Sequence, residues 1–392
     1  MKVVGILLLC FLGLGQAEAK LHVCGDHFCD SSNRRVFLSG ANAAWFFEGF
    51  DFGNNQYPYE RKAGYENWIT QIRNHGGNSI RVFLHDNCQT TPYIDDHNGH
   101  TYAPDKEGHL VRDLNDLLHF AALHKVYVFF VLFSGAQKKD THWKLQGLIV
   151  DNTKRQAYVD NALKPIVRGV KNQPYLGGWE IMNEMEGVIT IEGSGDACFD
   201  TSVLSGSGAG FAGQTYHPKQ LLAFINHLTA AIKSEDHSAL VTSGSWNPKS
   251  NTDSTHFGHK YHNFYSDHCL VHAGNNAHPS GKLDFFQIHT YAKAQGDHYD
   301  NVAPFYHSGQ EKSVYGLSKP VVIGEFSHHK GDGWAITSQY NHAYYHGYAG
   351  AWAWQYKQEP SDHDQDDAAT INRGLNQLKG KNDQSNGGLV TL

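Results

Sequence analysis

Two glutamates stand where apolar segments of the chain end. Glu184 closes the segment Trp179-Glu-Ile-Met-Asn-Glu, and Glu325 follows Val-Val-Ile-Gly. Such a position is unfavourable for a carboxylate unless it faces a polar site. Two carboxyl groups at one site could cleave a glycosidic bond, with one attacking the anomeric carbon and the other protonating the leaving oxygen. The two acids are far apart in the sequence, so this chemistry requires a fold that brings the ends of distant segments together.

Further polar and aromatic side chains end the same kind of segment. They are Arg81, His85, Asn183, His289, Tyr291 and Trp354. An arginine near the attacking carboxylate would favour its ionised form, and a tyrosine hydroxyl could hold its orientation through a hydrogen bond. The protonated carboxyl group needs the opposite environment, with little solvation or a nearby negative charge.

Eight short segments rich in β-branched and aromatic residues are predicted to be strands. They span residues 36–45, 79–84, 126–133, 176–183, 239–246, 284–291, 320–327 and 347–356. Most are apolar along their whole length, as in Val126-Tyr-Val-Phe-Phe-Val-Leu-Phe. Continuous apolar strands have both faces buried, which is typical of a parallel sheet covered by helices.

Amphipathic helical patterns lie between these segments. Apolar residues recur at three- and four-residue spacing over residues 110–121 and 221–232, and again over 158–170, where Pro165 is unfavourable. Strands that alternate with helices predict an α/β fold, a (β/α)8 TIM barrel. An open doubly wound sheet is disfavoured, because no Gly-rich nucleotide-binding turn follows the first strand.

A single catalytic domain is expected over residues 20–392. Its barrel core would cover about residues 36–356, followed by a polar C-terminal extension. Long loops at 187–214 and 247–282 follow strands, so they belong to the C-terminal face, where barrel enzymes carry their catalytic groups. Residues 1–19 combine a basic start, a short apolar core and a small-x-small ending, which is typical of a secretory signal peptide. We therefore expect a secreted, extracellular protein.

The cysteines fit an exported protein, in which disulfide bonds persist. Cys24 and Cys29 are close enough in the sequence to clip the N-terminal segment. Cys198 and Cys269 lie in polar, Gly/Ser-rich stretches, where a disulfide would restrain long loops. Five cysteines follow the signal peptide, so at least one is unpaired, and we expect it to be Cys88.

The composition argues against several classes of partner. A net charge of −7 offers no basic face for nucleic acid. The apolar run at the N-terminus is too short to cross a membrane, and no other segment is long and apolar enough to do so. The 27 histidines show neither HExxH nor paired Cys-x-x-Cys spacing, so a zinc site is disfavoured. We expect no metal, no other cofactor and a monomer.

The order of the residues at the predicted strand ends resembles a known family. Asn183 and Glu184 after the fourth strand, with Glu325 after the seventh, are similar to the retaining glycosidases built on this barrel. The set that matches the pattern of glycoside hydrolase family five is Arg81, Asn183, Glu184, His289, Tyr291, Glu325 and Trp354. The segments Trp-Glu-Ile-Met-Asn-Glu and Gly-Ala-Trp-Ala-Trp-Gln-Tyr further resemble secreted endo-β-1,4-mannanases of invertebrates.

The resemblance implies a role for each residue. Glu325 would be the nucleophile, and Glu184 the general acid and then the base. His289 would assist in setting the proton on Glu184, and Asn183 would bond the sugar 2-OH. Trp354 would form the floor of the subsite for the distorted ring. The expected reaction is endo-acting hydrolysis, with retention, of β-1,4 bonds in mannan, glucomannan or galactomannan.

Other residues are weaker candidates for the cleft. Trp45, Trp143 and Trp246 follow the first, third and fifth strands and could stack on sugars or fill the core. His85 could bond a sugar hydroxyl. The acidic segment 362–367 is expected to be a solvated loop, with closure of the cleft or calcium binding as alternatives.

Three other functions stay open at this point. A β-1,4-glucanase would share the fold and all seven matched residues. A non-catalytic carbohydrate-binding barrel is disfavoured, because such a protein should have lost a carboxylate and both are present. A histidine-rich metal-binding protein is the most remote alternative.

Overall fold

The computed structural model describes residues 20–136, 141–258, 261–291, 302–357, 359, 362 and 364–381. The expected signal peptide at 1–19 lies outside these residues. The described part of the chain contains no helix with the length and apolar character that crossing a membrane requires.

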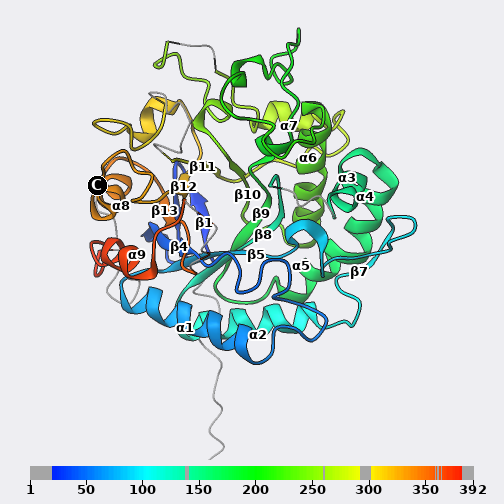
Figure 1. Ribbon diagram of the computed structural model, residues 1–392, viewed down its shortest axis with the longest axis horizontal. Helices are drawn as coiled ribbons and strands as arrows, with labels where there is room; N and C mark the ends of the chain where they lie inside the picture. The colour runs from blue at the N-terminus through cyan, green and yellow to red at the C-terminus, as the bar shows by residue number, and fades with distance from the viewer. Residues whose placement is uncertain are drawn as a thin grey trace, which may run out of the picture.

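Eight parallel strands form a closed barrel in which strands that follow one another in the sequence are neighbours (Figure 1). They are β4 (Leu38–Asn42), β5 (Ser79–Phe83), β8 (Tyr127–Ser134), β9 (Leu176–Asn183), β10 (Val241–Ser245), β11 (Phe286–His289), β12 (Val321–Glu325) and β13 (Gly350–Ala353). All eight lie within one residue of the predicted segments, and nearly all their residues are buried. The last strand pairs with the first, which confirms the predicted (β/α)8 barrel.

Helices surround the strands (Figure 1). They are α1 (Glu60–Asn74), α2 (Leu110–Leu123), α3 (His142–Val150), α4 (Asn152–Tyr158), α5 (Lys164–Val170), α6 (Pro218–Glu235), α7 (Asp267–Ala273), α8 (Ile336–Tyr345) and α9 (Ala368–Leu375). The longer helices bury an apolar stripe, as α2 does with Leu114, Leu117 and Leu118, and α7 packs on α6. α9 packs against α8 and α1, so the C-terminal extension also covers the barrel.

The helix predicted over residues 158–170 is divided into two parts. One π-helical turn, η2 (Val159–Leu163), separates α4 from α5. Proline lacks the backbone N–H that a helix interior needs, and its ring clashes with the carbonyl four residues earlier. The wider turn places Pro165 in the first turn of α5, where proline is tolerated.

An antiparallel sheet covers the N-terminal end of the barrel. It consists of β1 (His22–Cys24), β2 (His27–Cys29) and β3 (Arg35–Val36). Phe28 packs edge to face on Phe285, with ring centroids 5.1 Å apart, in an apolar cluster at the starts of the barrel strands. The predicted disulfide between Cys24 and Cys29 closes the β1–β2 hairpin.

Long segments at the opposite, C-terminal end carry short helices. The segment after β9 contains the 3₁₀ turns η3 (Met185–Val188) and η4 (Ser202–Leu204), and the one after β10 contains η5 (Pro248–Ser250) and α7. α7 was not predicted, because its sequence is short and polar. The predicted disulfide Cys198–Cys269 joins the two segments. Cys88 is buried with a free thiol, also as predicted.

Candidate active site

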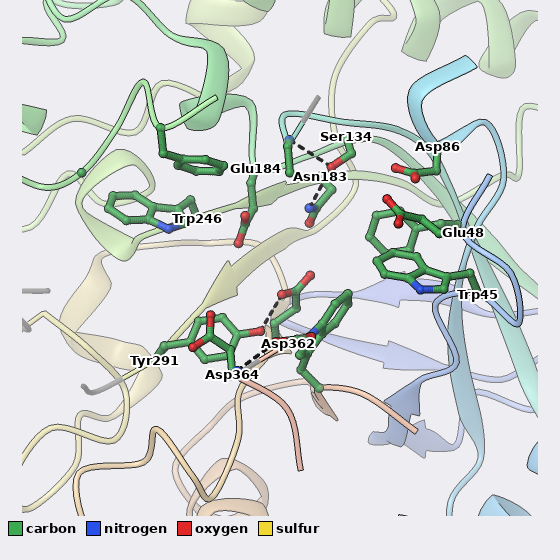
Figure 2. Close-up of a pocket in the computed structure, with 16 residues that line it drawn as sticks. Trp45, Glu48, Asp86, Ser134, Asn183, Glu184, Trp246, Tyr291, Asp362 and Asp364 are labelled. Atoms are coloured by element: carbon green, nitrogen blue, oxygen red, sulfur yellow. Dashed lines mark hydrogen bonds between the residues drawn. The ribbon is translucent and has the colours of Figure 1, made fainter. Parts of the chain in front are cut away.

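A cleft of about 440 Å³ opens at the C-terminal ends of the barrel strands (Figure 2). Asn183, Glu184, Tyr291, Glu325 and Trp354 all line it, so the fold brings most of the predicted site together. Trp246 lies on the side of Glu184, and Trp45 lies across the cleft (Figure 2). Six lining residues are acidic: Glu48, Asp86, Glu184, Glu325, Asp362 and Asp364. None of the described lining residues is lysine or arginine.

Arg81, on β5, is fully buried and connects four strands. Its Nη1 donates to Glu325 Oε1 at 2.7 Å and to Asn42 Oδ1 at 2.8 Å. Its Nη2 donates to Asn183 Oδ1 at 2.7 Å, and its Nε and Nη2 form a two-point pair with Glu180, each at 2.7 Å. Burial lowers the pKa of Arg81, but the two carboxylates raise it above its ordinary value. The guanidinium therefore stays charged and fixes the groups around it.

Glu180 and Asn42 are parts of this site that the sequence analysis missed. Glu180 lies within β9 and points into the barrel, where it is 1% exposed. Asn42 ends β4 and donates from Nδ2 to the Gly324 carbonyl at 2.9 Å. A charge inside an otherwise apolar strand needs a partner, and this was the available signal for Glu180.

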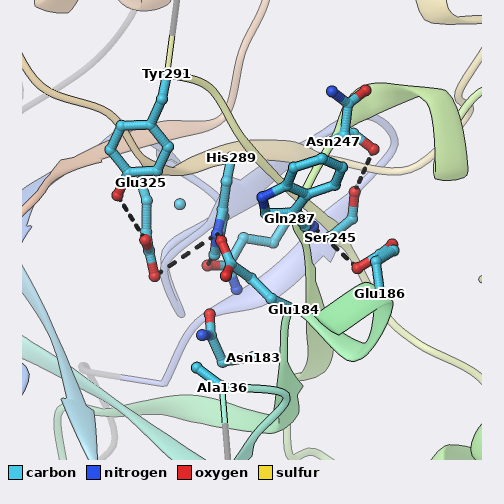
Figure 3. Close-up of polar contacts among 12 residues, drawn as sticks. Ala136, Asn183, Glu184, Glu186, Ser245, Asn247, Gln287, His289, Tyr291 and Glu325 are labelled. Atoms are coloured by element: carbon cyan, nitrogen blue, oxygen red, sulfur yellow. Dashed lines mark hydrogen bonds and ion pairs between the residues drawn. The ribbon is translucent and has the colours of Figure 1, made fainter. Parts of the chain in front are cut away.

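Glu325 ends β12 and is held through both carboxylate oxygens. Arg81 binds Oε1, and the Tyr291 hydroxyl donates to Oε2 at 2.6 Å (Figure 3). Burial raises the pKa of Glu325, while Arg81 and Tyr291 oppose the rise because both favour the ionised form. These contacts fix the orientation of the carboxylate.

Glu184 follows β9 directly and has a left-handed backbone, with φ of 48°. This conformation is uncommon for a residue other than glycine and turns the chain sharply at the strand end. Burial raises the pKa of Glu184 to about 8, and the negative charge of Glu186 adds to the effect while Arg81 opposes it. Glu184 therefore holds a proton at neutral pH, unlike a carboxyl group in water.

His289 ends β11 and lies between the two acids. Its Nδ1 is 2.7 Å from Glu184 Oε1 and 3.6 Å from Glu325 Oε1. Burial lowers the pKa of His289 to about 4, so the ring is neutral at neutral pH. Donor atoms of His289, Glu184 and Glu325 lie within 4.8 Å of one another, as metal ligands can. A cation there would compete with the proton between His289 and Glu184.

Two relatives span most of the chain, although no protein-family model matches it. Mannan endo-1,4-beta-mannosidase of Mytilus edulis is 46% identical over 338 residues, which are 86% of this chain and 88% of the relative. The enzyme of the same name from Cryptopygus antarcticus is 38% identical over 363 residues, covering 92% of this chain and 90% of the relative. The chain belongs to the mannan endo-1,4-β-mannosidase family.

Solved structures of β-mannanases agree with this membership. That of Mytilus edulis superposes with a TM-score of 0.85 at 42% identity and covers 96% of this chain and 99% of its own. The β-1,4-mannanase of Aplysia kurodai gives 0.85 at 42% identity, covering 95% and 99%. The mannanase fold is thus shared along nearly the whole chain.

Aromatic side chains form both ends of this mannanase-family cleft. Trp354 packs edge to face on Trp45, with ring centroids 5.6 Å apart, and its Nε1 donates to Asp362 Oδ2 at 2.6 Å. Trp246 lies 6.1 Å from Phe211, which projects from the long segment after β9. Trp45 and Trp246 both line the cleft, and their contact with sugar stays a prediction.

Trp246 is held next to Glu184 by another buried carboxyl group that the sequence analysis missed. Glu186 accepts hydrogen bonds from the Trp246 backbone N–H at 3.1 Å, from the Tyr265 hydroxyl at 2.8 Å and from the Ser250 hydroxyl. Burial raises the pKa of Glu186. Because Glu186 lies in η3, two residues after Glu184, its hydrogen bond to Trp246 connects this wall of the cleft to the segment that carries Glu184.

The acidic segment 362–367 is only in part the solvated loop that was predicted, since Asp367 and the side chain of Asp364 are exposed but other acids of the segment are not. Asp362 and Asp364 line the cleft. Asp366 is 6% exposed and accepts from the backbone N–H groups of His328 at 2.6 Å and His329 at 3.2 Å. These two backbone N–H groups follow β12 and need an acceptor, which the buried Asp366 carboxylate provides.

His85 and Trp143 lie away from the cleft lining. His85 is 1% exposed and packs against the rings of Phe133 and Tyr158. β5 ends at Phe83, so His85 falls in the next turn and points outward between barrel and helices. Trp143 belongs to α3, beyond the strand end from which its position was inferred. Neither residue is placed to contact a sugar in this cleft.

Proposed function

We propose that this protein is a secreted, endo-acting mannanase that hydrolyses β-1,4-mannosidic bonds with retention of configuration. The observation that carries the mechanism is a close pair of buried carboxyl groups, of which Glu325 alone accepts hydrogen bonds from both Arg81 and Tyr291. Oxygens of Glu325 and Glu184 lie within 4.8 Å of each other. Retaining enzymes hold their carboxyl groups about 5–5.5 Å apart, whereas inverting enzymes leave about 6.5–9.5 Å for a water molecule. The close spacing supports retention.

The first step is attack on the anomeric carbon. Glu325, kept ionised by Arg81 and Tyr291, forms a bond to this carbon as the bond to the leaving oxygen breaks. Glu184 donates its proton to that oxygen, so the leaving chain departs as an alcohol. Asn183, whose Oδ1 is fixed by Arg81, lies beside Glu184 and is suited to bond the sugar 2-OH. The product of this step is a glycosyl ester on Glu325.

Water completes the reaction. Glu325 loses its negative charge in the ester, which favours ionisation of Glu184. Glu184 then takes a proton from a water molecule, whose oxygen attacks the anomeric carbon and displaces Glu325. Two inversions give overall retention, and both acids return to their starting protonation states.

The substrate follows from the family and the lining of the cleft. Relatives that span nearly all of the chain are named for hydrolysis of mannan, which favours mannose over the glucose of a β-1,4-glucanase. Trp45 with Trp354 at one end of the cleft and Trp246 at the other provide apolar ring surfaces, as expected for a polymer that occupies several subsites. The two disulfides and the sequence of the N-terminal segment favour export. The exported protein would act on polysaccharide as a monomer.

The test is a set of assays on soluble mannan, glucomannan and a neutral cellulose derivative. We expect mannan-type polymers to be cleaved preferentially, and Glu325→Ala and Glu184→Gln to lose at least about a hundredfold in kcat/KM. Glu48→Gln is the matched control, since Glu48 lines the cleft outside the pair. Preferential cleavage of the cellulose derivative would contradict the proposed mannan substrate. Full activity of Glu325→Ala would contradict the proposed mechanism. Early products seen by NMR should be β-anomers.

A further inference from the structure

A continuous chain of hydrogen-bonded groups runs from Glu180 to Glu184 through two side chains of β11. Gln287 Nε2 donates to Glu180 Oε2 at 2.7 Å. Gln287 Oε1 lies 3.3 Å from His289 Nε2, and His289 Nδ1 lies 2.7 Å from Glu184 Oε1. Figure 3 shows Gln287, His289 and Glu184 close together, and the two contacts of His289 use different ring nitrogens. Gln287 contributes nothing to the lining of the cleft, so its contact with the site passes through His289.

The direction of every bond in this chain follows from its first member. Glu180 is a carboxylate in a two-point pair with Arg81, so it can only accept hydrogen bonds. The NH₂ group of Gln287 must therefore face Glu180, and its carbonyl oxygen must face His289. A carbonyl oxygen can only accept, which makes His289 Nε2 the donor.

The tautomer of His289 also determines which atom carries the proton between His289 and Glu184. A neutral imidazole carries one N–H, so a ring that donates from Nε2 can only accept at Nδ1. The proton in the 2.7 Å contact between His289 Nδ1 and Glu184 Oε1 then belongs to Glu184.

We propose that Gln287 is a positioning residue that fixes His289 as its Nε2–H tautomer and thereby keeps the catalytic proton on Glu184. This inference rests on the proposed role of Glu184 as the general acid. A hydrogen bond to the neutral form of an acid disfavours its ionisation, so the relay works in the same direction as the burial of Glu184.

Two glycines leave space in the barrel interior for the side chains of Glu180, Gln287 and His289, which together with Glu184 form the relay. A Cβ on Gly324 of β12 would lie 1.9 Å from Gln287 Oε1. A Cβ on Gly244 of β10 would lie 2.6 Å from Glu180 Oε1 and 3.1 Å from His289 Nε2. Glycines on both neighbouring strands thus leave room for the side chains of the relay, as expected if their contacts are selected.

Other charges also act on Glu184 and His289, and each must stay constant in a test. Glu186, Glu180 and Asp364 raise the pKa of Glu184, and Arg81 lowers it. Glu325 and Glu180 favour the protonated form of His289, and Arg81 disfavours it. A neutral replacement of Gln287 changes none of these charges.

Gln287→Met removes the acceptor from His289 Nε2 at nearly the same side-chain length. The ring is then free to adopt the Nδ1–H tautomer, which donates to ionised Glu184 and stabilises it. We expect the alkaline limb of kcat/KM to move about one to two units toward lower pH, while the acidic limb, set by Glu325, stays in place.

Two variants separate this effect from a general loss of packing. Gln287→Glu restores an acceptor for His289 Nε2, and it adds no charge when its carboxyl group keeps a proton that is donated to Glu180, so its alkaline limb should return to the wild-type position. Gln339→Met removes another fully buried glutamine, which donates to the Ser327 carbonyl at 3.0 Å behind the barrel. It should leave both limbs unmoved.

The tautomer can also be read directly in the wild-type protein. ¹⁵N NMR of wild-type protein, with the His289 signals identified by their loss in His289→Asn, distinguishes protonated from bare ring nitrogens. We expect a protonated Nε2 and a bare Nδ1. A protonated Nδ1, or an unmoved alkaline limb in Gln287→Met, would overturn the proposal. Failure of the proposed function is distinguishable, because it would leave Glu184→Gln active whatever the tautomer.

Discussion

Removal of the Tyr291 hydroxyl should shift the acidic side of the pH profile. This hydroxyl donates to Glu325 Oε2 at 2.6 Å; Glu325 is buried and Tyr291 is partly buried. Tyr291→Phe keeps the ring and deletes this one donor. Because the hydrogen bond favours the ionised carboxylate, its loss raises the pKa of Glu325 further above its ordinary value.

The size of the shift follows from the kind of bond that is lost. Hydrogen bonds to a charged group contribute about 1.5–3 kcal/mol, and one pKa unit corresponds to about 1.4 kcal/mol. The acidic limb of kcat/KM should therefore move up by about one to two pH units. Arg81 still holds the other oxygen, so the carboxylate should remain near its position. We expect the plateau rate to fall about ten- to a hundredfold through less restricted orientation.

The assay is kcat/KM on soluble mannan across the pH range, with the free enzyme's limbs compared between variants. Tyr265→Phe is the matched control, since it removes a hydroxyl that donates at 2.8 Å to a different buried carboxyl group, Glu186. The control should leave the acidic limb in place. An unmoved acidic limb in Tyr291→Phe, with a shifted alkaline limb, would show that Tyr291 acts on Glu184 and would refute the reasoning.

Three further outcomes follow from the site and the disulfides. The wild-type kcat/KM should fall above about pH 8, because Glu184 loses its proton there, and titration of kcat/KM checks this. Trp246→Ala should raise KM on mannan about fivefold, because it removes about 1 kcal/mol of stacking on a sugar ring. Trp143→Ala is the control and should leave KM unchanged, since Trp143 is not among the residues that line the cleft. An equal rise of KM in both variants would contradict a sugar contact at Trp246. Cys198→Ser removes a disulfide that spans 71 residues and should lower the free energy of unfolding by about 4 kcal/mol. Cys24→Ser removes one that spans 5 residues and should lower it by about 2 kcal/mol. Denaturant unfolding measures both values.

Strand positions and the main acids were predictable because they depend on local pattern. A run such as Val126–Phe133 must be buried on both faces wherever it occurs, and its end marks the active face of a barrel. Residues directly at a strand end, such as Glu325 and His289, were therefore placed correctly in the fold. His85, two residues after β5, and Trp143, in α3, are not among the described residues that line the cleft, because beyond a strand end the direction of a side chain depends on the loop.

The interior partners were not predictable from pattern in the same way. Glu180 and Gln287 lie inside strands, on a layer where the neighbour is set by barrel register rather than by sequence distance. The partner of Glu180 is Arg81 from β5, and the partner of Gln287 is Glu180 from β9; both contacts form only when the barrel closes. Gly244 carries no chemistry at all, and its importance is visible only from the atoms that surround it.

The acidic lining of the cleft gives the enzyme a way to sort polymers before any subsite recognises a sugar. Acidic side chains line it at both ends, and no described lining residue carries a positive charge. Such a surface concentrates field lines of one sign within a concave site. A neutral hexose chain enters this field without electrostatic work, while a chain that carries uronate or sulfate groups is repelled at every residue. Added salt shortens the range of that repulsion, so discrimination against anionic polysaccharides should weaken as ionic strength rises.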